Sequence, residues 1–162
     1  MKTAATDAFY AAFRAACGVT DPDYDAVIFG EGPPLADELL ALVLEGRKRA
    51  TAMLARDVTV KGEPRPRLGG HFVVVDGAGR PRAVCRTTDV REGPLDSVDE
   101  AFAWDEGEGD RTRADWLDGH RRYFTGQAAR EGFAMHDGIA VIFERFTVVW
   151  PPEAADQPSR RG

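Results

Sequence analysis

The stretch Gly46-Arg47-Lys48-Arg49-Ala50-Thr51 marks the point where an apolar helix pattern ends and strand-like residues begin. A glycine directly after a helix can adopt left-handed backbone torsions, which turn the chain and free neighbouring amides for an anionic or carbonyl ligand. Basic residues beside a helix C-terminus are also favoured by the helix dipole alone. The stretch therefore predicts a helix-to-strand turn, and the residues alone leave open whether Lys48 and Thr51 form a site.

Apolar residues at helical spacing before this turn predict a helix over residues 34–45, and residues 49–55 after it can run extended. The same spacing near the N-terminus predicts a helix over residues 5–17. A third helix is expected over residues 113–131, because Thr112 is a suitable N-cap for it. The chain thus combines helices with strands.

A hairpin is indicated by Asp76-Gly77-Ala78-Gly79-Arg80, whose glycines can take positive backbone torsions between the strand-like runs 72–75 and 83–88. The first run is apolar without interruption, which predicts burial on both faces of its strand. The last expected strand, residues 139–150, alternates in its second half. Glu144 then shares a face with buried apolar residues, and we expect its side chain to point inward.

Length and composition limit the possible classes of protein. With 162 residues and a net charge of −6, the chain is the size of one domain and does not fit a protein whose whole surface binds duplex nucleic acid. Cys17 and Cys85 belong to no paired motif, so a reduced, cytoplasmic protein without a disulfide framework is expected. The sequence also predicts no metal site, no other cofactor and no membrane segment.

Seven segments, in this order along the chain, carry a resemblance to a known family. They are Phe29-Gly30-Glu31, Leu35 to Leu44, Gly46 to Thr51, Leu68-Gly69-Gly70-His71, Arg86-Thr87-Thr88-Asp89-Val90, the run Glu106-Gly107-Glu108-Gly109-Asp110 with the following helix that bears Trp116 and His120, and Glu144-Arg145-Phe146. On these segments the chain resembles the ASCH family, the activating-signal-cointegrator homology domains. That family's fold is similar to the PUA-type RNA-binding barrel.

The resemblance implies an α+β domain, a small and mostly antiparallel β-barrel of about five or six strands flanked by helices. It divides the chain into an N-terminal helical extension over residues 1–26, an ASCH domain over residues 27–150 and a flexible C-terminal tail over residues 151–162. A monomer or a weak dimer is expected.

In the compact ASCH enzymes that hydrolyse N(4)-acetylcytidine, the matching lysine is a proton acceptor and the matching threonine a nucleophile. These roles fall on Lys48 and Thr51. A glutamate from the acidic segment is the proton donor, and Glu108 is the match, with Glu106 as the alternative two residues away. The roles are chemically reasonable, because a lysine partly removed from water can take a proton from a hydroxyl and a buried carboxyl group can keep one.

A ligand such as single-stranded RNA or a nucleoside would also need groups that bind phosphate or stack on a base. Arg47, Arg49, Arg86 and Trp104 are the candidates, together with Glu106. We expect Trp116 to pack in the core, and His120 to be a satisfied interior or pocket-edge histidine.

Three functions remain open from the sequence. The first is hydrolysis of a modified nucleoside or of RNA without a metal ion, and the second is RNA binding without catalysis. The third is regulation through a small metabolite. The additional N-terminal helix and the proline-rich loop over residues 61–67 depart from the compact enzymes, so the sequence does not choose among the three.

Overall fold

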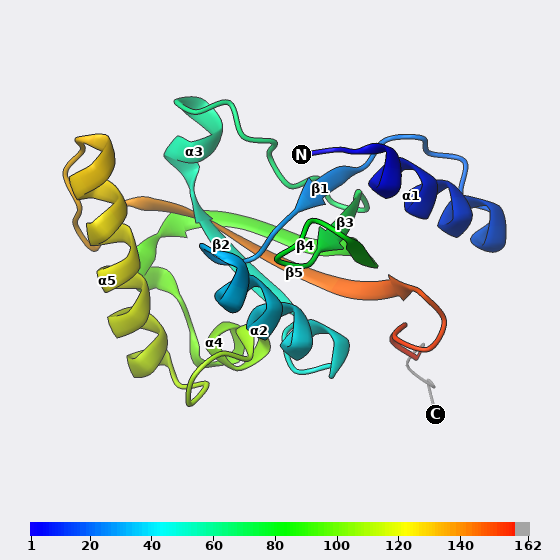
Figure 1. Cartoon of the computed structure of the whole chain (residues 1–162). Helices are drawn as coiled ribbons and strands as arrows, with labels where there is room; N and C mark the ends of the chain where they lie inside the picture. The colour runs from blue at the N-terminus through cyan, green and yellow to red at the C-terminus, as the bar shows by residue number, and fades with distance from the viewer. Residues whose placement is uncertain (158–162) are drawn as a thin grey trace.

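The computed structural model describes residues 1–157, which form one curled, five-stranded half-barrel with helices around it (Figure 1). The strands, in sheet order, are β1 (Asp25–Val27), β3 (His71–Val75), β4 (Pro81–Pro94), β5 (Ala140–Trp150) and β2 (Ala50–Leu54). Strand β1 pairs parallel with β3, and the other neighbours are antiparallel. The predicted α+β class and mostly antiparallel sheet are confirmed.

Helices lie on both faces and at one end of this sheet. They are α1 (Ala4–Cys17), α2 (Pro33–Leu44), α3 (Ala55–Thr59), the 3₁₀ turn η1 (Leu95–Ser97), α4 (Glu100–Glu106) and α5 (Arg113–Glu131). The three predicted helices are present, and Thr112 caps α5 as expected. Among residues 1–157, no helix has the length and apolar character needed to cross a membrane.

Helix α3 was not predicted; residues 49–55 were expected to run extended, and no element was assigned to residues 56–59. The chain leaves β2 at Leu54 and turns directly into α3, and Leu54 offers no side-chain hydrogen bond to cap the helix. The start of a helix is recognised in a sequence mainly by such a capping residue, so the sequence did not indicate the start of α3.

Strand β3 shows how both faces of the sheet are covered. Val73 packs against Tyr10 and Phe13 of α1, whereas Phe72 and Val74 belong to the cluster formed with α2. Successive side chains of a strand point to opposite faces, so the uninterrupted apolar run places one set under each helix. The prediction that this strand is buried on both faces is confirmed.

At the end of the sheet, α4 and α5 pack over β2 and β5 around Phe102, Trp116 and Phe143. Figure 1 places α5 at the end of the sheet opposite to α1, with α4 and α2 along the same lower edge. The loop that connects α4 to α5 therefore passes the start of β2. This arrangement brings the acidic segment after α4 to the turn that carries Lys48.

The tail predicted to be flexible, residues 151–162, lies partly inside the described chain. Within that part, Asp156 accepts hydrogen bonds from the Arg49 guanidinium at 2.8 and 2.6 Å and from the Thr147 hydroxyl at 2.7 Å. These contacts hold residues 151–157 against the edge of the sheet. Residues 158–162 lie outside the described residues.

Candidate functional site

The turn after α2 is fixed by its backbone. Gly46 has a φ of 86°, and the amide groups of Arg47 and Lys48 both donate to the carbonyl oxygen of Leu42, at 2.9 and 3.0 Å. The Arg49 amide donates to the carbonyl oxygen of Asp105 at 2.6 Å, which ties the turn to the end of α4. A glycine adopts this φ at little cost, so the predicted left-handed turn is present and directs Lys48 inward.

Lys48 is the most enclosed charged group of the site, with only 1% of its side chain exposed. Its Nζ donates to the carbonyl oxygen of Ala50 at 2.8 Å, lies 3.2 Å from Oε1 of Glu108, and is 5.2 Å from the centre of the Phe29 ring. A buried ammonium is stable only when it is paired and hydrogen-bonded. Ala50 and Glu108 account for two of its three N–H groups within the described residues, which leaves one for a ligand.

Glu106 anchors the other side of the site and is itself buried. Its Oε2 accepts a hydrogen bond from Trp116 Nε1 at 2.6 Å, and its Oε1 lies 3.0 Å from His120 Nε2. Burial by itself would raise the pKa of Glu106, but Lys48, His120 and Trp116 together hold the pKa below its usual range. Glu106 is therefore an ionised acceptor at neutral pH.

His120 is held on both ring nitrogens and on one ring face. Nδ1 lies 2.8 Å from the carbonyl oxygen of Trp116, and the two rings stack with centroids 3.7 Å apart. Both nitrogens therefore face acceptors, a pattern that the charged imidazolium satisfies. Burial would lower the pKa of His120, yet the hydrogen bond and charge of Glu106 raise the pKa above its ordinary value.

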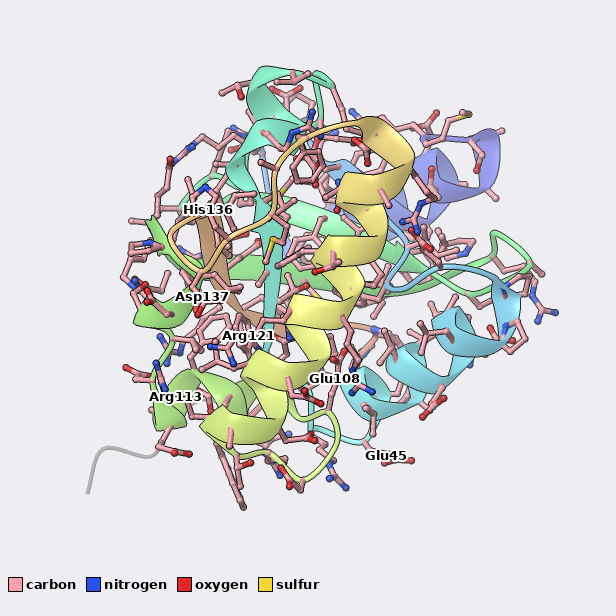
Figure 2. All side chains as sticks on the ribbon, turned by 90° about the vertical axis from the view of Figure 1, so that its left-hand side faces the viewer. Glu45, Glu108, Arg113, Arg121, His136 and Asp137 are labelled. Atoms are coloured by element: carbon pink, nitrogen blue, oxygen red, sulfur yellow. The ribbon has the colours of Figure 1, made fainter. Side chains whose placement is uncertain are left out.

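Glu108 differs from Glu106 in exposure and in protonation. About a third of its side chain, 32%, is exposed, and Figure 2 shows Glu108 between α2 and α5. Burial raises the pKa of Glu108; the Lys48 ammonium opposes that effect, and the negative charge of Glu106 adds to it. Of the two glutamates, Glu108 is thus the one suited to carry a proton, and Glu106 is the one suited to hold Trp116 and His120.

These groups line one cavity of about 280 Å³. The polar side chains of its wall are Lys48, Thr51, Glu106, Glu108, Asp115 and His120, and the larger apolar and aromatic side chains are Phe29, Leu35, Leu39, Trp116, Tyr123 and Phe124. A small number of polar groups in a mostly apolar wall is typical of a small-molecule site. The structure therefore brings together the three residues matched to the hydrolytic enzymes.

Thr51 sits on β2 at the edge of this cavity, opposite Glu144 of β5. Within residues 1–157 its hydroxyl makes no hydrogen bond to the Lys48 ammonium, which donates to Ala50 instead. Direct contact between Thr51 and Lys48 is therefore not part of this arrangement. Catalysis would require the two side chains to approach each other when a substrate binds.

Two of the predicted ligand-binding residues, Arg47 and Arg49, have structural partners outside the cavity wall. Arg47 donates to the carbonyl oxygens of Gly107 and Gly109 at 2.9 and 3.2 Å. Arg49 pairs with Asp156 at 2.6 Å. These two guanidinium groups hold the acidic loop and the C-terminal segment.

Arg86 is exposed on β4, and Trp104, at 57% exposed, lies under the Arg111 guanidinium at 3.8 Å. Within the described chain, none of Arg47, Arg49, Arg86 and Trp104 lines the cavity. Binding of a ligand by these four residues stays a prediction, and in this structure they lie outside the cavity wall. The aromatic wall comes from Phe29 and from Trp116, Tyr123 and Phe124 of α5; Trp116 also packs in the core, as expected.

Residues 1–157 contain no group of three or more His, Cys, Asp or Glu side chains placed to hold a metal ion. The carboxyl groups of Glu106 and Glu108 are instead directed to Trp116, His120 and Lys48, as described above.

Comparison with known proteins identifies a family and similar solved structures. A family model described as the ASCH domain matches residues 25–150. The chain is similar to the crystal structure of an ASCH domain from Lactobacillus crispatus JV V101, with a TM-score of 0.81 and 27% identity, over 90% of this chain and 94% of that one. A crystal structure of an Enterococcus faecalis V583 protein gives a TM-score of 0.80 and 28% identity, over 88% and 86% of the two chains. Comparison with curated protein sequences finds no match.

Proposed function

Because the chain belongs to the ASCH domain family, a PUA-like and nucleic-acid-associated family, we propose that the cavity at Lys48 binds a modified nucleoside and hydrolyses an amide on its base. The single observation that supports this proposal best is the convergence of Lys48, Thr51 and Glu108 on one cavity. An ammonium or amine, a hydroxyl and a carboxyl group around a common space are the groups that nucleophilic acyl transfer requires.

The Lys48–Glu108 ion pair supplies both proton-transfer roles. Transfer of one proton from the Lys48 ammonium to the Glu108 carboxylate across their 3.2 Å contact yields a neutral amine and a neutral acid. The raised pKa of Glu108 makes the neutral acid accessible. The amine then accepts the proton of the Thr51 hydroxyl, while the acid stays ready to protonate the leaving nitrogen.

The reaction balances in two stages. First, the Thr51 oxygen bonds to the acyl carbon and its proton goes to Lys48; the C–N bond then breaks, and the leaving amine takes the proton of Glu108. Second, water attacks the acyl carbon of the resulting Thr51 ester and gives one proton to the Glu108 carboxylate; the ester C–O bond then breaks, the Thr51 oxygen takes that proton to regenerate the hydroxyl, and the carboxylic acid is released. The aromatic wall would stack on the base and exclude bulk water.

Binding without catalysis is the second candidate. The observation that favours it is the hydrogen bond of Lys48 Nζ to the carbonyl oxygen of Ala50 in place of Thr51. In that case, Lys48 would serve as a fixed donor to a carbonyl or phosphate oxygen of RNA or a nucleoside.

Incubation with N(4)-acetylcytidine and with short single-stranded RNAs separates the two candidates. We compare the wild type with Lys48→Met, which keeps the length of the side chain and removes its nitrogen, and with Lys2→Met, at an exposed lysine outside the cavity, as the matched control. Hydrolysis predicts release of cytidine by the wild type and the control, and a loss of at least about 100-fold in Lys48→Met. RNA binding that weakens with salt, without turnover of either substrate, would support the binding function instead.

A further inference from the structure

A second, larger chamber adjoins the Lys48 cavity and takes no part in the mechanism above. It has a volume of about 720 Å³ and shares Phe29, Thr51 and Tyr123 with the Lys48 cavity. Thr51 thus stands at the boundary between the two spaces. A ligand that reaches Thr51 from the Lys48 side can extend into the second chamber.

Glu144 is a buried polar group of this chamber whose hydrogen bonding is incomplete. Only 8% of the residue is exposed, and its Oε1 accepts a hydrogen bond from the Thr87 hydroxyl at 2.6 Å. Within residues 1–157, Oε2 of Glu144 has no hydrogen-bond partner. Every fully buried side-chain oxygen or nitrogen in this part of the chain has a partner, so Oε2 is not fully buried. Oε2 must therefore reach the open space of the chamber.

The charge around Glu144 is negative and uncompensated. Asp25 lies on the same chamber wall, and neither carboxyl group makes a salt bridge within the described chain. His71 does not offset this charge, since burial, with a further contribution from Arg86, lowers the pKa of His71. Burial raises the pKa of Glu144; the Thr87 hydrogen bond opposes this effect, and Asp25 adds to it.

The basic side chains of the chamber, those of Lys61 and Arg67, are exposed, and Lys61 is already paired with Asp57 and Glu131. A phosphate group near Glu144 and Asp25 would be repelled by like charge. An O–H or N–H group would instead satisfy the open carboxyl oxygen, which is costly to leave unpaired in a buried site. The chemistry of this wall thus selects hydrogen-bond donors.

We propose that the Glu144 chamber is a second subsite for the same ligand, in which Oε2 of Glu144 accepts a hydrogen bond from a sugar hydroxyl or an exocyclic amine. This inference rests on the proposed function, because it assumes that a nucleoside occupies the Lys48 cavity. Glu144 is opposite Thr51 in the sheet register, and such opposed residues have Cβ atoms about 4.5–5.5 Å apart. That separation is smaller than a nucleoside, so one molecule can contact both residues.

Calorimetric titration with cytidine and with 2′,3′-dideoxycytidine tests the subsite. The informative variant is Glu144→Gln, because glutamine keeps an oxygen for the Thr87 hydroxyl and places an N–H₂ group where Oε2 accepts. Glu38→Gln, at an exposed position of α2 outside both cavities, is the matched control. We expect Glu144→Gln to weaken cytidine binding at least about tenfold and the control to leave it unchanged.

The dideoxy probe identifies the donor. If the donor is a sugar hydroxyl, the wild type binds dideoxycytidine more weakly and Glu144→Gln has no further effect on that ligand. If the donor is the amine, Glu144→Gln weakens both ligands equally. If Glu144→Gln changes the affinity for cytidine by less than about twofold, the proposed subsite is wrong. Should Glu144→Gln fail to fold, Glu144→Asp, which withdraws the carboxyl group by one methylene, replaces it with the same expected result.

Turnover of N(4)-acetylcytidine by the same preparations distinguishes failure of the second subsite from failure of the proposed function. If the wild type hydrolyses it and Glu144→Gln leaves kcat/KM unchanged, the proposed function stands and the second subsite is wrong. If the wild type neither binds cytidine nor hydrolyses its acetylated form, both proposals are wrong.

Discussion

The Lys48 ammonium and the Glu108 carboxylate form an ion pair at 3.2 Å in the wall of one cavity, with Lys48 buried and Glu108 partly exposed. The pair joins two segments about sixty residues apart, the turn after α2 and the loop after α4. Burial raises the pKa of Glu108 and the Lys48 ammonium opposes that rise, while removal of Glu108 would leave the buried Lys48 ammonium without its counter-charge. The chemistry proposed for this protein depends on that relationship.

Thr51 is expected to act through its hydroxyl alone. Thr51→Val keeps the shape of the side chain and removes the oxygen, so kcat/KM for N(4)-acetylcytidine should fall at least about 100-fold. Thr51→Ser keeps a nucleophile and should retain activity within about tenfold of the wild type. Steady-state kinetics, together with thermal unfolding to verify the fold, provide the check. Equal activity of the valine and serine variants would rule out Thr51 as the nucleophile.

The hydrogen bond between Trp116 and Glu106 is expected to stabilise the fold. Trp116→Phe removes the Nε1 donor that Glu106 accepts at 2.6 Å, and a hydrogen bond to a charged group contributes about 1.5–3 kcal/mol. Trp104→Phe is the matched control, since Trp104 is 57% exposed and its stacked Arg111 contributes only about 0.5–1 kcal/mol. Urea unfolding measures both. A smaller loss in Trp116→Phe than in Trp104→Phe would contradict this role.

Stability is expected to fall as the pH rises above about 6.5, the ordinary pKa of histidine. The pKa of His120 is raised in the folded chain, so the native state binds more protons than the unfolded state between the two values. The free energy of unfolding therefore decreases with rising pH through the folded pKa of His120. The lowered pKa of His71 has the opposite effect on stability, and that effect falls at pH values below about 6.5.

Urea unfolding at a series of pH values from about 6 to 9 measures this dependence. His120→Gln is the control: it should be less stable than the wild type at the acid end of the series and should lack the decrease that His120 causes. A wild-type protein whose stability is constant or rises over the same range would show that the Glu106–His120 pair does not titrate in this way.

The acidic loop is expected to depend on Gly107 for its close approach to the Lys48 turn. Gly107 has a φ of 75°, and a Cβ there would meet the carbonyl oxygen of Arg47 and lie 2.7 Å from its carbonyl carbon. Gly132 has a similar φ of 76° with nothing within 4 Å. Gly132→Ala should cost only the backbone strain, about 1–2 kcal/mol, and Gly107→Ala clearly more. Urea unfolding measures both variants, and equal losses of stability in Gly107→Ala and Gly132→Ala would contradict the close approach.

The sequence predicted the parts of the fold that local signals specify. Gly46 stopped α2, Thr112 started α5, and the glycines between residues 76 and 80 marked the hairpin, because turns and caps depend on a few neighbouring residues. Helix α3 was not predicted because it follows β2 without a capping side chain. The inward direction of Glu144 was also predictable from the alternation of β5.

The site was predictable in part, for a related reason. Lys48, Thr51 and the acidic loop were found through the family resemblance, and the structure brings them to one cavity. The roles of the arginines were not predictable, because their partners are distant in sequence: Arg47 binds the carbonyl oxygen of Gly107, and Arg49 binds Asp156. The residue types alone do not distinguish an arginine that binds a phosphate from one that holds a loop.

The central claim is that Lys48 and Glu108 act as one unit on an amide, and a double-variant kinetic cycle tests it most directly. The measurement is kcat/KM for N(4)-acetylcytidine in the wild type, Lys48→Met, Glu108→Gln and the double variant. We predict that each single variant loses at least about 100-fold and that the double variant loses no more than about tenfold beyond the worse single variant. Losses that multiply in the double variant, or a wild type that does not turn over the substrate, would contradict the account.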